Sequence, residues 1–128
     1  MTLKENTDKG RVVLQKLFEI RDQLHYIHLQ TDSYSSHKAL NSFYDGILDL
    51  ADSFIETYQG IYGRIKGRLS LAIESDLDAI TYVQSIRQYF AKDGLIRKSF
   101  APEETHLANT ADEMLALVDK TLYLLTLK

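Results

Sequence analysis

The sequence predicts an all-α fold in which four amphipathic helices form one four-helix bundle domain over residues 1–128. Apolar residues recur in steps of three and four along four segments, as the buried face of a helix requires. The chain contains only six Gly and one Pro, and 45% of its residues are hydrophobic, so neither disorder nor a fibrous repeat is indicated. A chain of 128 residues is long enough to bury one core but short for two.

The first two helices are predicted on either side of a polar turn near residue 31. The apolar face of the first helix, over residues 7–31, consists of Val13, Leu17, Ile20, Leu24 and Ile27. The stretch TDSYSS then offers Asp32, Ser33 or Ser35 as the N-cap of the second helix. The apolar face of that helix consists of Leu40, Tyr44, Ile47, Ala51, Phe54 and Tyr58. Because the turn is short, we expect the two helices to pack as an antiparallel hairpin.

A glycine-containing connection is predicted between the second and third helices. The glycines that interrupt the helical pattern are Gly60, Gly63 and Gly67. The connection, at roughly residues 60–74, is long enough for a crossover. The third helix is expected to start near Ser75, which forms a capping-box pattern with Asp78, and to stop at Gly94. Its apolar face consists of Ile80, Val83, Ile86 and Phe90.

The last helix is predicted to open at Pro102, because proline is favoured in the first helical turn. Glu103 and Glu104 suit the positive end of the helix dipole. The apolar face consists of Leu107, Ala111, Met114, Val118, Thr121 and Leu125.

Composition and charge exclude several classes of function. No apolar run approaches the roughly 20 residues of a membrane span, and the first residues are too polar for a signal peptide, so we expect a cytoplasmic protein. The formal net charge of -3 argues against general binding to nucleic acid. There are no cysteines, so any metal site must use His, Asp and Glu.

Residues of the kind that bind metals gather along the first two helices. They are His25, His37, Asn41, Asp52 and Glu56. His25 and His37 lie at similar distances on either side of the turn, so an antiparallel hairpin brings them to one level, where they could share an ion. His37 and Asn41 are four residues apart, as are Asp52 and Glu56, so each pair projects from one helix face. Each pair is a candidate half-site.

The separation of the two half-sites predicts a homodimer. From His37 to Asp52 the second helix rises roughly 22 Å, which is too far for one metal ion to bind both. A second copy packed antiparallel across a two-fold axis would place its Asp52 and Glu56 opposite His25 and His37 of the first. Two symmetric sites would result. All four helix-two positions lie on a flank beside the apolar face, together with Leu48 and Ile55, and this flank suits a partner helix.

The segment HYIHLQTDSYSSHKALNSFYDGILDLADSFIE resembles the Dps (DNA protection during starvation) mini-ferritins. That family has a His before the turn, a His early in the second helix, an acid one turn later, and an Asp and a Glu near the helix end. Here the matching positions, with every spacing kept, are His25, His37, Asn41, Asp52 and Glu56, and Tyr26 stands where the family commonly has Trp. The resemblance covers about the first half of the chain.

This resemblance implies a ferritin-like bundle with a ferroxidase centre between two subunits. His25 and His37 would come from one chain, and Asp52 and Glu56 from the other. In the family, ferrous iron is oxidised by peroxide or oxygen and stored inside a hollow twelve-subunit shell. Iron is therefore the expected metal, and zinc could substitute for it.

Two departures from the family pattern leave a second interpretation of the function open. Asn41 replaces an acid, and a neutral amide supplies less negative charge for ferric iron. The chain also lacks a Lys-rich tail, so we do not expect DNA binding. The alternative is a helical-bundle structural or interaction protein whose ferritin-like site no longer binds metal. His28 falls on the apolar side and is expected to be packed and hydrogen-bonded rather than a ligand.

Overall fold

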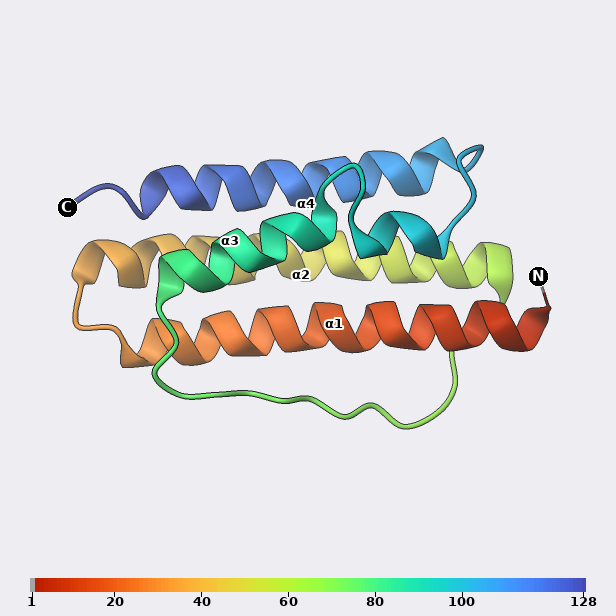
Figure 1. Ribbon diagram of the computed structural model, residues 1–128, viewed down its shortest axis with the longest axis horizontal. Coiled ribbons are helices and arrows are strands. Elements are labelled where there is room, and N and C mark those ends of the chain that lie inside the picture. The colour runs from red at the N-terminus through yellow and green to blue at the C-terminus, as the bar shows by residue number, and fades with distance from the viewer. Residues whose placement is uncertain (1) are drawn as a thin grey trace.

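The computed structural model describes residues 2–128 and contains four α-helices packed around one core (Figure 1). The helices are α1 (Leu3–Gln30), α2 (Tyr34–Tyr62), α3 (Ala79–Phe90) and α4 (Thr105–Leu124), and a 3₁₀ turn, η1 (Leu95–Ser99), lies between α3 and α4. The described residues include no strand. The predicted all-α four-helix bundle is confirmed.

The connectivity includes one long crossover. Figure 1 shows α1 and α2 as an antiparallel hairpin, after which the chain returns along the outer side of α1, so that α3 runs parallel to α2 and α4 runs back. We call this return segment, residues 64–78, the strap. The crossover predicted between helices two and three is therefore present.

The predicted apolar faces form the core. Every predicted core position of α1 and α4 is buried, as are Leu40, Ile47, Phe54 and Tyr58 of α2. Phe43, which lies outside the predicted α2 face, is also fully buried. Within α3 one expectation is wrong: Ile80 is 41% exposed, because Val83, Ile86, Tyr89 and Phe90 form the buried face instead.

The starts of α1 and α3 differ from the predicted ones. Helix α1 begins at Leu3 instead of residue 7, because Thr2 and Glu5 form a capping box that satisfies the first backbone N–H groups. Helix α3 begins at Ala79 instead of near Ser75, because the Asp78 carboxylate accepts hydrogen bonds from the Thr81 N–H at 2.9 Å and the Thr81 hydroxyl at 2.8 Å. These bonds stabilise the charged carboxylate and lower the pKa of Asp78.

Helix α4 also begins later than predicted. Pro102 lies in a turn before the helix, and Glu104 is the N-cap. The Glu104 carboxylate accepts from the Ala101 N–H at 3.0 Å, while the Glu104 N–H donates to the Ala101 carbonyl at 3.0 Å. This closed turn prevents the helix from continuing back to Pro102.

The largely buried side chain of Arg97 in η1 joins α3 to α4. Its guanidinium donates to the Phe90 carbonyl at 2.8 Å and 3.1 Å and to the Ala108 carbonyl at 3.3 Å. It also pairs with Asp112 at 2.9 Å. Arg97 thereby satisfies a free carbonyl at the end of α3.

Glycines allow a close helix contact in α1 and determine where α2 ends. A Cβ at Gly10 would lie 2.7 Å from the Tyr58 ring and 2.9 Å from Ile65 of the strap, so only glycine lets the three segments approach this closely. Gly60, predicted to lie in the connection, is instead inside α2, which continues to Tyr62. The helix ends at Gly63, whose φ of 101° favours glycine.

Within residues 2–128 no helix is both long and apolar enough to cross a membrane.

Candidate metal centre at the α1–α2 hairpin

A short turn brings the last turns of α1 beside the first turn of α2. The Thr31 N–H closes α1 on the Ile27 carbonyl at 3.0 Å. Ser33, one of the three predicted N-caps, then starts α2 by accepting a hydrogen bond from the Ser36 N–H at 3.2 Å. The antiparallel hairpin predicted from the sequence is confirmed, and it places His28 and His37 side by side.

His28 and His37 form a reciprocal pair. Their rings stack with centroids 3.7 Å apart and planes 21° apart. The His28 Nδ1 lies 2.8 Å from the His37 carbonyl oxygen, and the His37 Nδ1 lies 2.9 Å from the His28 carbonyl oxygen. Because a carbonyl oxygen only accepts, both Nδ1 atoms carry the proton, which leaves each neutral ring with a lone pair on Nε2. A carbonyl bonded to the other ring nitrogen is the usual support of a metal-binding histidine.

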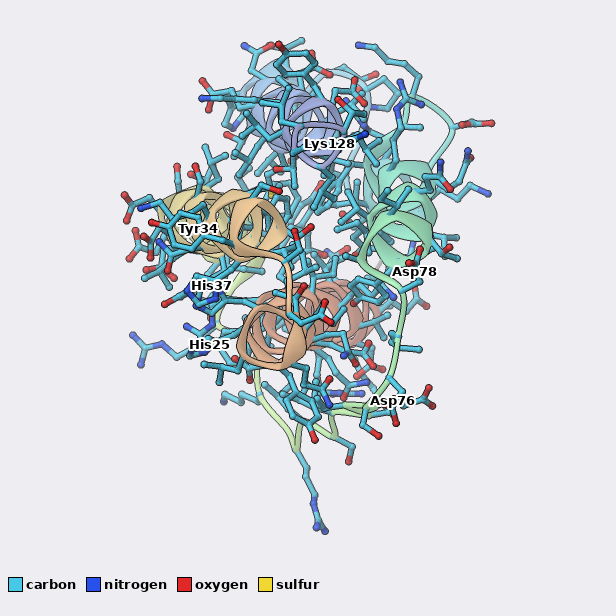
Figure 2. The ribbon with its side chains drawn as sticks, turned by 90° about the vertical axis from the view of Figure 1, so that its left-hand side faces the viewer. His25, Tyr34, His37, Asp76, Asp78 and Lys128 are labelled. Atoms are coloured by element: carbon cyan, nitrogen blue, oxygen red, sulfur yellow. The ribbon has the colours of Figure 1, made fainter. Side chains whose placement is uncertain are left out.

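His25 lies next to this pair, but its ring contacts a different partner. Its exposed ring stacks on Tyr44 with centroids 4.5 Å apart and lies 5.9 Å from the ring of His28. The ring stacked directly on His37 is that of His28, not His25. Figure 2 shows His25 and His37 on the same side of the hairpin, one on each helix. Tyr44 was predicted on the core face of α2, and its helical spacing alone does not indicate that its ring stacks on His25.

The expectation for His28 itself is confirmed. The side chain is 7% exposed and hydrogen-bonded, as expected of a packed histidine. Its effect on His37 was not foreseen, because the contact depends on the geometry of the turn.

Asn41 lies one turn after His37 and is half-buried. Its Nδ2 donates to the Asp45 Oδ2 at 3.3 Å, which leaves the Asn41 Oδ1 as a neutral ligand atom. Asp45 places a negative charge beside the position where the Dps family has an acid.

The second half-site lies farther along α2. Asp52 and Glu56 are both exposed, and within the part of the chain that the structure describes neither carboxylate has an ion pair or side-chain hydrogen bond. They continue a row of exposed acids at Asp45 and Asp49, with steps of four, three and four residues that keep the row on one helix face. Asp45 and Asp49 were not among the predicted site residues. The spacing of this row was a usable signal.

The flank around these acids is less apolar than expected. Leu48 is 41% exposed, but Ile55, which was expected on the same partner-facing flank, is only 8% exposed and belongs to the core. Among residues 2–128, no group of three or more His, Asp or Glu side chains is arranged to hold a metal ion.

The protein is an all-helical bundle with one crossover and with a pair of histidines at one end. In comparison with known proteins, residues 28–125 match the family described as "Family of unknown function (DUF5856)". The chain belongs to this family. It is also 31% identical over 120 residues, 94% of this chain and 90% of the relative, to the "Uncharacterized 14.6 kDa protein in mobD-ri intergenic region" of Enterobacteria phage T4. No solved structure matches the chain. The resemblance to Dps mini-ferritins remains a prediction from residue spacing.

Proposed function

We propose that the protein is a Dps-like homodimer that binds iron at two symmetric sites between antiparallel α2 helices. Each site combines His25 and His37 of one chain with Asp52 and Glu56 of the other. Asn41 contributes its free amide oxygen. Imidazole nitrogens and carboxylate oxygens are ligands that bind iron, and zinc could bind to the same atoms. With oxygen or peroxide as the oxidant, the same site would convert ferrous to ferric iron.

The observation that carries this proposal is the pair of unpartnered carboxylates on α2. Asp52 and Glu56 are one helical turn apart and exposed, and no cation of the described chain neutralises them. Two copies of α2 that run antiparallel about residues 46–47 would bring His37 opposite Glu56 and Asn41 opposite Asp52. The hydrogen bond that the His37 Nδ1–H donates to the His28 carbonyl favours the His37 tautomer that offers Nε2 to a metal.

Metal titration of the whole chain tests the proposal. We expect one zinc or ferrous ion per chain by anaerobic calorimetry, and loss of that binding in His37→Ala and in Asp52→Asn/Glu56→Gln. His106→Ala is the matched control, since His106 is an exposed histidine of α4 outside the site. Growth of ferric absorbance after air is admitted then tests oxidation.

A mixing experiment tests whether two chains share each site. His37→Ala and Asp52→Asn/Glu56→Gln chains are each inactive as homodimers, but a mixed dimer contains one intact site. With random mixing we expect about a quarter of the wild-type binding capacity to return. Recovery of none would contradict a shared site. Absence of metal binding in the wild type would favour the alternative, a metal-free structural or interaction bundle.

A further inference from the structure

The middle of the strap lies extended along α1. The Gln15 Oε1 accepts from the Ser70 N–H at 2.8 Å. The Gln23 amide makes two bonds to Glu74: its Oε1 accepts from the N–H at 2.9 Å, and its Nε2 donates to the carbonyl at 2.8 Å. From Gln15 to Gln23 the helix rises about 12 Å. An extended chain covers about 13 Å from Ser70 to Glu74, which matches that rise.

This attachment leaves one edge of the strap open. Successive residues of an extended strand direct their N–H and C=O groups to opposite edges. Because Ser70 and Glu74 face α1, the groups of Leu69, Leu71 and Ile73 face the other edge. Within residues 2–128 these three backbones make no hydrogen bond. Figure 1 shows the strap on the outside of α1, with no other element beyond it.

The charges of the strap are arranged in two opposite halves. The first half carries Arg64, Lys66 and Arg68, and the second carries Glu74, Asp76 and Asp78. Within the described chain none of the six forms an ion pair. Figure 2 shows Asp76 and Asp78 where the strap rises to α3.

A second copy of the strap complements both the open edge and the charges. In an antiparallel pair centred on Leu71, residues equally far from Leu71 oppose each other. Leu71 then meets itself and Leu69 meets Ile73, all through their open-edge groups. Within the extended stretch, Arg68 of one copy opposes Glu74 of the other. A parallel pair in register would set like charges against each other, which is unfavourable.

We propose that the strap forms a two-stranded antiparallel ribbon with the strap of a second copy, centred on Leu71. Gly67 and Asp76, with φ values of 107° and 63°, bound the extended stretch. The ribbon would gather the apolar side chains of both copies on one of its faces, since alternate residues point the same way. Leu71 and Ile73 are now each 37% exposed. The contact uses neither the metal ligands nor the α2 flank.

Disulfide trapping tests the register, because the chain has no cysteine of its own. In the ribbon the two Leu71 Cα atoms lie about 5.5 Å apart, within disulfide range. The two Ile73 Cα atoms are separated by about 13 Å along the strand direction and are out of range. Ile73 is equally exposed, so it is a matched control. We expect Leu71→Cys to cross-link at least about tenfold faster than Ile73→Cys under mild oxidation. Equal rates, or no cross-linking at residue 71, would overturn the pairing.

Charge reversal provides an independent test in the full chain. We expect Arg68→Glu to weaken the association between straps about tenfold in sedimentation experiments, because residue 68 faces Glu74 of the other copy. Glu74→Arg should do the same, and the double variant should recover wild-type association. Circular dichroism verifies that each variant remains folded. Association that neither reversal weakens is formed through other surfaces, such as the α2 helices, and a monomeric wild type has no contact between straps; both results would overturn the proposal.

Discussion

His28 and His37 each donate an Nδ1–H hydrogen bond to the backbone carbonyl of the other, with their rings stacked 3.7 Å apart. The two bonds join the last turn of α1 to the first turn of α2. The pair therefore fixes both the hairpin and the tautomer of the ring that we propose as a metal ligand. Its first consequence can be observed without metal.

Nitrogen NMR of the imidazoles should show both rings as Nδ1–H tautomers at a pH where histidine is neutral. The reason is that each Nδ1 faces a carbonyl oxygen, which cannot donate. The exposed ring of His106 serves as an internal reference, since it has no such partner in the described chain. Nε2–H signals from His28 and His37 would contradict the reciprocal geometry.

Replacing His28 should destabilise the hairpin. His28→Ala removes a nearly buried ring, its stacking on His37 and the hydrogen bond from the His28 Nδ1–H to the His37 carbonyl, and we expect a loss of about 1–3 kcal/mol in the free energy of unfolding. Urea denaturation without metal measures it. His25→Ala is the matched control, because His25 is exposed, and it should cost less than about 1 kcal/mol.

Much of the fold could be predicted because it depends on local periodicity. The steps of three and four that placed Leu17, Leu24 and Met114 in apolar faces are imposed by the helix itself, and all three are buried. The first residue of each helix was harder to predict, because several adjacent residues can cap a helix. Ser75 and Asp78 are both good N-caps, and only the bonds of Asp78 to Thr81 decide between them.

The site could be predicted only in part, because its contacts join distant residues. Spacing alone places Asp52 and Glu56 on one face of α2, and both are exposed there. The stacking of His37 on His28 depends on the turn, and no periodicity encodes it. The same holds for Gln23, whose polar side chain interrupts an apolar face yet is 2% exposed, because it binds the backbone of Glu74.

Gln23 should control the attachment of the strap. Gln23→Ala leaves the Glu74 N–H and carbonyl without their partner, and we expect it to cost about 1–3 kcal/mol. Hydrogen exchange at Glu74 should also accelerate, since the amide loses its acceptor. Gln30→Ala, at an exposed position of α1, is the control and should change neither quantity. Unchanged exchange at Glu74 would contradict the described attachment.

The ion pair between Arg97 and Asp112 predicts an acid-sensitive contribution to stability. Hydrogen bonds from Arg97 and Lys92 lower the pKa of Asp112. A carboxyl whose pKa is lower in the folded state stabilises the protein above its unfolded pKa, and this stabilisation is lost as the pH falls through the folded pKa. Asp112→Asn should therefore cost up to about 1 kcal/mol at neutral pH, and the difference from wild type should vanish in acid. Glu113→Gln, an exposed neighbour, should show no such convergence.

Gly10 and Gly60 should respond in opposite directions to the same substitution. Gly10→Ala places a methyl group 2.7 Å from the Tyr58 ring and 2.9 Å from Ile65, and such overpacking costs about 1–3 kcal/mol. Gly60 is also helical, but nothing lies within 4 Å of its added Cβ. Gly60→Ala should stabilise the protein by about 0.5–1 kcal/mol, because alanine loses less backbone entropy in a helix. Thermal unfolding of both variants measures the difference in stability. Similar effects at the two positions would contradict the close approach of α1, α2 and the strap at Gly10.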